Sequence, residues 1–542
     1  MFAFAGTAVA VLATFRVADV AIARLGRLPA ASYREAVFLD DVIARWWRLV
    51  FSGGRWWLAV VAILMLAAVL VLDRRRLGGA GWRRARALFA EWDALDEPRA
   101  LRWLVVGVAG VSAWALSCYA RNLYLEQLHV VDRLVVLALW LAIAWRPIAV
   151  FPFAIAATAV AGQFLVPLGF ISWTEMELVL RFSVLFGAFW VVRAVTGRRE
   201  SDVLIFAWCC LLATTYWNSG LGKLRVGWLT HPHVHLLLLG AYANGWLAHL
   251  ESGTVERAAR AIARVAVPLM LFTLVVECGS ILMLWRRWSI VLFVALATAF
   301  HLGAFAMTGI LFWKWMLVEA MLIAYLLHGR RLTRLRIFAP GLLALSAAAI
   351  LAHPLWAPSE NLTWFDTPLT YSLEFEGIDA SGASHVLPAG FFRPYGDAIV
   401  LGPAGAPSPH AKLTGPMGVT MDRSLAKSLR AVRAPEAIFA AERARGVARA
   451  DSASAAFDAF VSAYAANARC ARERDPLVLR VIGVPRHLWT FPLDADLRCG
   501  VPLTRVRVFE STTFVDGGAL RVIRRVPVRD IAVTSAVGTA AR

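Results

Sequence analysis

Long runs of apolar residues, separated by short polar and arginine-rich stretches, occupy the first two thirds of the chain. A membrane-crossing helix needs about 20 such residues in succession. The pattern therefore predicts an all-α membrane domain of about 9–11 transmembrane helices. The first run is expected to be a retained helix, because no basic residue precedes it as in a signal peptide. The predicted spans are residues 2–22, 56–72, 102–119, 132–145, 148–170, 178–195, 203–218, 265–284, 288–308, 312–327 and 337–353.

From Trp356 onward the pattern changes to mixed composition with proline and glycine punctuation. Thr370–Ile378 alternates apolar and polar positions, which is typical of a half-buried strand. We expect two parts, a transmembrane domain at 1–355 and a soluble α+β domain at 356–542. Within the second part, further strands are predicted at 477–484 and 503–510, helices within 424–472, and a loop at 401–408.

Composition agrees with the membrane assignment. Hydrophobic residues make up 59% of the 542 residues, and 23 are tryptophans, which excludes an ordinary soluble protein. The formal net charge is +19, but the arginines lie between apolar runs rather than in a basic stripe interleaved with aromatic residues. The sequence therefore predicts the lipid bilayer as partner and no nucleic acid.

The arginines also predict an orientation. Four arginine-rich loops fall on one side if the spans alternate, and the positive-inside rule places that side in the cytoplasm. The N-terminus is then cytoplasmic and the C-terminal domain periplasmic or extracellular. The arginine- and alanine-heavy composition favours a bacterial inner membrane. The four loops are 73–102, 196–202, 285–288 and 328–336, whereas the basic residues of 24–55 and 257–264 depart from the rule.

The cysteines fall into two groups. Four lie in apolar runs and are expected to be small core residues. Cys470 and Cys499 are the only pair in the soluble part, where an oxidising exterior favours a disulfide between them. The four in apolar runs are Cys118, Cys209, Cys210 and Cys278.

Lysine is scarce, and one lysine stands out. Only four of the 56 basic residues are lysines, and Lys223 lies in the apolar segment 216–229 at the predicted outer border of the membrane. A desolvated ammonium can lose its proton and act as a base, which a guanidinium cannot do. An interfacial lysine that reaches toward water is the alternative interpretation.

Ionisable residues inside apolar spans are costly and are candidates for function. Glu277 and His301 lie in consecutive predicted helices, so antiparallel packing predicts a contact between them, either structural or catalytic. Arg16 and Asp19 are three residues apart and are expected to neutralise each other. The full set is Arg16, Asp19, Arg181, Glu277, His301 and Glu319.

Metal binding is not predicted. His231, His233 and His235 alternate, and alternate residues converge only on a strand, whereas the following segment, 236–250, has the pattern of an interfacial helix. Lys314 lies between two tryptophans and is expected to be an interfacial anchor. The chain contains no P-loop, dinucleotide fingerprint or nucleophilic serine elbow.

The segment that contains Tyr216, Lys223 and Trp228 resembles the signature of the vitamin K-dependent gamma-carboxylase-like family, also called the HTTM (horizontally transferred transmembrane) domain family. The resemblance covers about residues 10–330 and is closest to bacterial members. Other stretches that agree with it are 14–19 in the first helix, 277–286, 299–304 and 308–312.

The resemblance implies a chemistry. In carboxylases of this family, the lysine matching Lys223 deprotonates vitamin K hydroquinone. Oxygen then adds, and the strong base so formed removes a γ-proton from a glutamate, which captures carbon dioxide. The histidine matching His301 assists. A reduced quinone, oxygen and carbon dioxide are thus the implied co-substrates, and Glu277, Tyr216, Trp228, Arg16 and Asp19 belong to the supporting segments.

The chain departs from the carboxylases at one place. Asn122 stands where they carry a histidine, and Tyr124 follows as in the family. Two hypotheses result. One is a quinol-dependent carboxylase- or oxygenase-like enzyme with Lys223 as base and a peptide presented by the external domain. The other is a non-catalytic membrane protein that assists maturation or export of a secreted peptide.

Overall fold

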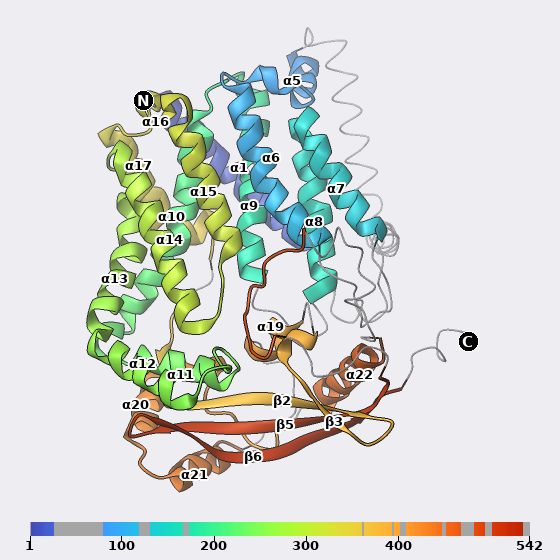
Figure 1. Cartoon of the computed structure of the whole chain (residues 1–542). Helices are drawn as coiled ribbons and strands as arrows, with labels where there is room; N and C mark the ends of the chain where they lie inside the picture. The colour runs from blue at the N-terminus through green and yellow to red at the C-terminus, as the bar shows by residue number, and fades with distance from the viewer. Residues whose placement is uncertain are drawn as a thin grey trace.

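The computed structural model describes residues 2–26, 80–118, 130–165, 173–359, 362–392, 395–401, 408–446, 451–467, 482–493 and 501–534. Most of these residues are helical, and those in strands follow residue 364. The N-terminal helices form a bundle that stands over a layer containing a β-sheet (Figure 1). The predicted span 56–72 lies outside the described residues.

Five described helices are long and apolar enough to cross a membrane, namely α1, α6, α9, α10 and α14. A sixth crossing results if α12 and α13, which meet at 69°, count as one bent span. The bundle consists of α1 (Phe2–Gly26), α5 (Ala80–Leu88), α6 (Pro98–Ser117), α7 (Val130–Trp145), α8 (Val150–Leu165), α9 (Trp173–Thr196), α10 (Asp202–Arg225), α13 (Ala266–Gly279), α14 (Arg287–Thr308), α15 (Trp313–Leu327), α16 (Arg331–Arg334), α17 (Pro340–Leu351) and α18 (His353–Trp356).

The predicted spans within the described residues coincide with helices, but several helices are short. The three predicted spans 265–284, 312–327 and 337–353 contain α13, α15 and α17, of 14, 15 and 12 residues. At 1.5 Å per residue these helices extend about 18–23 Å, against a hydrocarbon core of about 30 Å. The apolar runs therefore predict more membrane crossings than there are described helices long enough to cross the hydrocarbon core.

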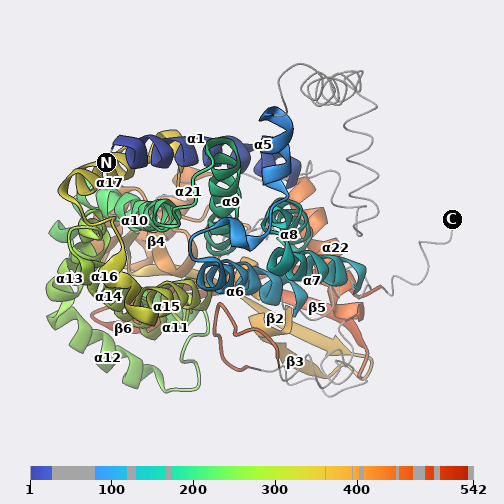
Figure 2. The same ribbon diagram turned by 90° about the horizontal axis from the view of Figure 1, so that it is seen from above.

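Helix α10 lies inside the bundle. Residues 203–214 are buried on all sides of the helix, as expected for a helix that is apolar around its whole circumference. It packs against α1, α9, α13 and α17, and Figure 2 shows α1, α9 and α13 around it. The carboxyl end of α10 is thereby placed inside the protein, close to the C-terminal layer.

The C-terminal part is an α+β layer, as predicted. Its four-stranded antiparallel sheet has the order β3-β2-β5-β6, and β1 pairs with β4 in a separate ladder. The strands are β1 (Phe365–Asp366), β2 (Leu369–Asp379), β3 (Ser384–Leu387), β4 (Val419–Thr420), β5 (Leu503–Asp516) and β6 (Ala519–Ala532), and the helices are α19 (Gly396–Leu401), α20 (Arg423–Ala431), α21 (Pro435–Arg445) and α22 (Asp451–Asn467).

Two sequence predictions for this part need correction. A strand was expected at 477–484, but residues 482–484 are not in a strand. Residues 477–481 lie outside the described residues, as do residues 402–407 of the predicted loop. Strand β6 was not predicted, because its four arginines hide the alternation of apolar positions.

Two helices lie between the bundle and the sheet, α11 (His235–Ala243) and α12 (Ser252–Arg264). The predicted interfacial helix 236–250 is thus shorter than expected. Backbone hydrogen bonds then join the two parts: Trp489 N donates to Gly309 O (2.9 Å), Leu311 N to His487 O (2.6 Å) and Phe491 N to Gly245 O (2.7 Å). The C-terminal layer is therefore attached to the loops at the end of the bundle.

Candidate functional site

Lys223 lies in the last turn of α10. The helix ends there because Gly227 adopts a left-handed conformation, with φ of 65°. A cation in the last turn is stabilised by the helix dipole. The side chain is only 7% exposed, so the prediction of a desolvated amine agrees with its position in the structure.

Three kinds of partner surround the Lys223 ammonium. Nζ donates to Glu277 Oε1 (2.6 Å), and the side chain of Glu277 is 4% exposed. Nζ also donates to the backbone oxygen of Leu362 (3.1 Å). The rings of Trp228 and Trp364 lie 5.6 and 5.8 Å from Nζ, within cation–π range. These contacts hold Nζ between a carboxylate, a backbone carbonyl and two indole rings.

A second buried group lies nearby, formed by Tyr216, His301 and Glu319. The Tyr216 hydroxyl donates to Glu319 Oε1 (2.5 Å) and lies 2.7 Å from His301 Nε2. A hydroxyl has one proton. With Glu319 ionised, His301 must therefore donate from Nε2, while its Nδ1 has no hydrogen-bond partner among the described residues.

Four helices position these two groups. Tyr216 and Lys223 are seven residues apart on α10, which is two turns, so they share a face about 10 Å apart along the axis. Glu277 comes from α13, His301 from α14 and Glu319 from α15. The two groups therefore lie on one face of α10, at two levels of the bundle.

The site contains buried polar atoms without hydrogen-bond partners among the described residues: Glu277 Oε2, His301 Nδ1 and Trp315 Nε1. Such atoms are uncommon in native proteins and call for a ligand or water. Rings of Phe293, Phe312 and Trp315 pack around Tyr216 and His301. The arrangement places apolar aromatic rings next to hydrogen-bond donors and acceptors.

The predicted contact between Glu277 and His301 is wrong. Glu277 binds Lys223, and the carboxylate beside His301 is that of Glu319, 3.7 Å from Nε2. Chain periodicity gives the depth of a residue along a helix but not the rotation of the helix about its axis. Glu319 was recognised only as an ionisable residue in an apolar span, without a role.

The predicted Arg16–Asp19 pair is also wrong. Asp19 accepts two hydrogen bonds from Arg181, from Nε (3.2 Å) and Nη2 (2.9 Å). Arg181 further donates to the backbone oxygen of Pro358 (2.9 Å). A long arginine from a neighbouring helix offers bidentate geometry that Arg16, on the same helix, cannot match.

The described residues of the segment 358–364, which are 358, 359 and 362–364, therefore lie along the bundle and contact three of its polar side chains. Its backbone oxygens accept from Arg181, from Asn218 (2.8 Å, to Ser359) and from Lys223. Sequence periodicity could not predict these contacts, because they involve backbone atoms of an irregular segment. These contacts attach the C-terminal layer directly to the Lys223 site.

Several predicted residues fall elsewhere. Asn122, Tyr124, Cys470 and Cys499 lie outside the described residues, so the disulfide stays a prediction. Lys314 is buried rather than interfacial, with the Trp313 ring 4.9 Å from its Nζ. The four remaining cysteines, Cys118, Cys209, Cys210 and Cys278, are free thiols.

The alternate histidines do not converge on a metal site. The described residues contain no group of three or more potential metal ligands. Burial, with the charge of Arg430, lowers the pKa of His233 to about 4, and the same causes lower the pKa of His235. Both imidazoles are therefore neutral at pH 7.

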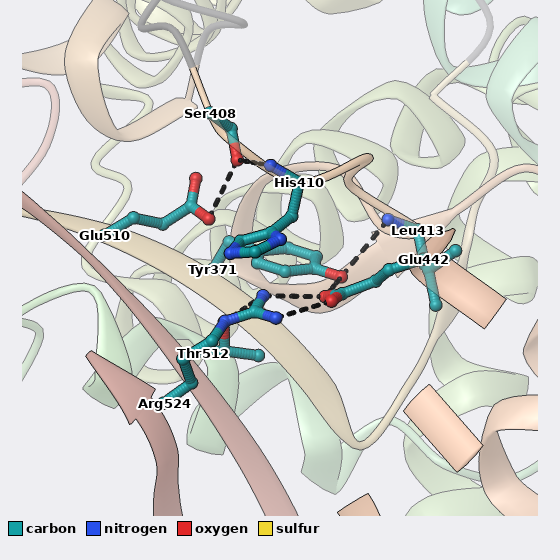
Figure 3. Close-up of polar contacts among 8 residues, drawn as sticks. All are labelled: Tyr371, Ser408, His410, Leu413, Glu442, Glu510, Thr512 and Arg524. Atoms are coloured by element: carbon teal, nitrogen blue, oxygen red, sulfur yellow. Dashed lines mark hydrogen bonds and ion pairs between the residues drawn. The ribbon is translucent and has the colours of Figure 1, made fainter. Parts of the chain in front are cut away.

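The C-terminal layer has a polar network that sequence reasoning missed. Arg524 of β6 binds Glu442 of α21 through Nη1 (2.6 Å) and Nη2 (2.9 Å), and the Tyr371 hydroxyl donates to Glu442 (2.9 Å) (Figure 3). Burial raises the pKa of Tyr371 well above its usual value. Glu442 of α21 thus binds side chains from two strands, so the network holds α21 against the sheet.

Glu510 forms the second half of this network. Its fully buried carboxylate accepts from the Ser408 hydroxyl (2.9 Å) and lies 3.3 Å from Lys412 Nζ. Ser408 in turn accepts from His410 N (3.2 Å). These bonds hold the 408–413 segment against β5.

Comparison of the chain with models of known protein families, with curated protein sequences and with solved structures found no match.

Proposed function

We propose that this protein is a membrane-embedded enzyme in which Lys223 is the base that deprotonates a lipid-soluble, quinol-like substrate. The observation that carries the proposal is the buried Lys223–Glu277 pair, 2.6 Å between Nζ and Oε1. It lies beside aromatic rings and beside polar atoms that have no hydrogen-bond partner in the described part of the chain. The resemblance to gamma-carboxylase-like proteins supports the same chemistry.

The pair supplies what a lysine base needs. An ammonium cannot accept a proton, but Glu277 is close enough to take one. Charge neutralisation is favoured when the surroundings are apolar. The resulting neutral amine can then accept a proton from a substrate hydroxyl. After one proton has moved from lysine to glutamate and one from substrate to lysine, Lys223 is again an ammonium and Glu277 is a neutral acid. The pair has then gained one proton and one positive charge, which balances the charge of the substrate anion. Glu277 releases its proton before the next turnover.

The residues of the site fit a reduced quinone. Glu277 Oε2 is an acceptor for a hydroxyl, and the rings of Phe293, Phe312 and Trp315 suit a flat ring system. A bound reduced quinone would supply an acidic hydroxyl and reducing electrons. Tyr216 and His301 would hold its position, and in the carboxylase-like form oxygen and carbon dioxide are co-substrates.

The arrangement in Figure 1 also supports a bacterial inner-membrane orientation. Helices α5 and α16 carry Arg83, Arg84, Arg331 and Arg334 and lie at the end of the bundle opposite the sheet, as does the N-terminus. The positive-inside rule places that end in the cytoplasm and the external domain in the periplasm. A secreted peptide is then the natural partner of the external domain.

One observation favours the non-catalytic alternative. Lys223 also donates to Leu362 O and lies near the rings of Trp228 and Trp364. A structural cation that attaches the external domain would have the same contacts. In that case the protein assists maturation or export of a secreted peptide without chemistry at Lys223.

The test is oxygen uptake by the purified protein in lipid nanodiscs with reduced menadione as the quinol. Lys223→Arg keeps the charge and removes the basicity, so we expect a loss of about 100-fold or more, as for a general base. Lys427→Arg, an exposed position on α20, is the matched control and should retain full activity.

Two outcomes would overturn the base assignment. The first is full activity of Lys223→Arg. The second is no quinol-dependent uptake by the wild type while Lys223→Arg has unchanged thermal stability, which would support the structural alternative. A Glu277→Gln variant that keeps its stability and loses activity would separate proton transfer from folding.

A further inference from the structure

The arginines of residues 257–264 lie outside the cytoplasmic loops and depart from the positive-inside rule. The structure places them on α12, an amphipathic helix between the bundle and the sheet (Figure 1). Val255 and Ala259 are buried on one face, and Glu256 Oε1 accepts from Leu520 N of β6 (2.9 Å). The helix is thus fixed to the protein on its apolar side.

The arginines lie on the opposite face. At 100° per residue, Arg257, Arg260 and Arg264 point about 120–180° away from the middle of the face that Val255 and Ala259 form. All three are exposed. Among the described residues, no carboxylate lies within ion-pair distance of them. Arg260 leans toward the β5–β6 hairpin near Gly518, whereas Arg257 bonds only within α12, to Thr254.

The position of α12 relative to the membrane follows from α13. The two helices meet at 69°, so α12 lies across the bundle where α13 runs along it. Directly after Arg264, Val265 between the two helices and Val267, Leu269 and Leu271 of α13 are exposed, as side chains that face lipid are. The basic face of α12 is thus level with the end of a lipid-facing surface, where headgroups lie.

We propose that the basic face of α12 binds the headgroups of anionic lipids in the leaflet next to the external domain. The guanidinium forms bidentate hydrogen bonds with phosphate, and an interfacial helix with arginines above an apolar boundary is suited to such lipids. This contact holds α12, and through Glu256 the edge strand β6, at the membrane surface. It also accounts for basic residues outside the cytoplasmic loops.

The test uses the full chain in uncharged detergent, titrated with phosphatidylglycerol, with bound lipid counted by native mass spectrometry. Each basic residue near a lipid surface contributes about fivefold in binding. We therefore expect the double variant Arg257→Gln/Arg264→Gln to bind phosphatidylglycerol roughly 20-fold more weakly. The Arg257→Lys/Arg264→Lys variant should restore most of the binding.

The matched control is Arg433→Gln/Arg443→Gln, beside and on α21, on the side of the sheet away from the bundle (Figure 1). Like Arg257, Arg433 forms a local hydrogen bond. Like Arg264, Arg443 lies in the last turn of its helix. This control variant should bind lipid as the wild type does. The proposal would be overturned if the α12 glutamine variant bound phosphatidylglycerol as tightly as the wild type, or if the wild type bound phosphatidylcholine as tightly as phosphatidylglycerol. It would also be overturned if the control variant lost as much binding as the α12 variant. Displacement of the lipid by excess inorganic phosphate would assign the site to a soluble anion instead.

Discussion

Lys223 and Glu277 form a buried ion pair whose members depend on each other. Removing two charges from water is costly, and their attraction offsets that cost only while both remain. Lys223 has additional partners in Leu362 O and two indole rings, whereas Glu277 Oε2 has none among the described residues. Without ligand, loss of the Lys223 side chain should therefore destabilise the protein more than loss of the Glu277 side chain.

A double-mutant cycle measures this dependence. Lys223→Met or Glu277→Leu alone leaves one buried charge and should destabilise the protein by about 3–5 kcal/mol. The double variant should recover most of the loss, because no charge is left unpaired. Thermal unfolding in detergent, followed by tryptophan fluorescence, gives the values. Losses that simply add would show that the two residues do not interact.

Asp366 provides a prediction about pH. It is 4% exposed, its Oδ1 has no partner among the described residues, and Arg430 donates to its backbone oxygen rather than to its carboxylate. Burial raises the pKa of Asp366 to about 7, although the charges of Arg430 and Lys223 act in the opposite direction. The folded protein thus keeps a proton that the unfolded chain loses near pH 4.

The sign follows from the bound protons. Between about pH 4 and 7 the folded state binds more protons than the unfolded state, so stability falls as pH rises through this window. The loss from Asp366 is on the order of 3–4 kcal/mol. Asp366→Asn should remove this part of the pH dependence. Melting temperatures from pH 4.5 to 8 that decline equally in both proteins would contradict the assignment.

The residues of the site were partly predictable for identifiable reasons. The scarcity of lysine singled out Lys223, and the cost of ionisable groups in apolar spans singled out Glu277 and His301. Their pairing was not predictable, because it depends on helix rotation and on the irregular segment 358–364. Trp364 and the partnership of Tyr216 with Glu319 are likewise consequences of tertiary packing.

At the scale of elements, the close approach of α10 and α13 brings Lys223 to Glu277. Gly220 permits it: a Cβ there would lie 2.7 Å from Cys278 Sγ and 2.9 Å from Glu277 Cβ. Larger residues at a close helix contact force the helices apart. The pair distance is therefore set by a glycine one turn away from the lysine.

Gly220→Ala should cost about 1–3 kcal/mol in stability and reduce any Lys223-dependent activity. Gly303→Ala, in the middle of α14 with open space around it, is the control. It should be neutral or slightly stabilising, since alanine is the better helix former. Thermal unfolding compares them, and equal effects of the two changes would refute the role of Gly220.

Elements differ in how well the sequence predicts them. Apolar runs indicated the helices of the bundle, and alternation indicated β2 and β5. Helix α12 was missed because its apolar stripe is only a few small residues wide, and β6 because an edge strand exposes one side and carries arginines. In both, contacts with the rest of the protein stabilise what the local pattern does not specify.

For the whole molecule, the junction between bundle and external domain is made by loop backbone. Gly309 ends α14 with φ of 73°, and its oxygen accepts from Trp489 N. A Cβ on Gly309 would lie 2.7 Å from both Trp246 Cε3 and Trp489 O. Docking of the external domain thus requires a residue without a side chain here.

Gly309→Ala tests whether this junction holds the two parts together. Gly197 offers a matched control, because it follows α9 with the same φ of 73° but has nothing within 4 Å of its Cβ position. Both alanine variants bear the backbone strain of about 1–2 kcal/mol. Only Gly309→Ala also forces Trp246 and the 487–491 segment to move.

Hydrogen exchange and limited proteolysis of the external domain report the difference. An additional loss of about 1–3 kcal/mol at the junction corresponds to roughly 5- to 150-fold faster exchange of the Trp489 and Phe491 amides in Gly309→Ala. Gly197→Ala should leave these amides as in the wild type. Equal exchange in both variants would mean that the domains are held by other contacts, such as those of segment 358–364.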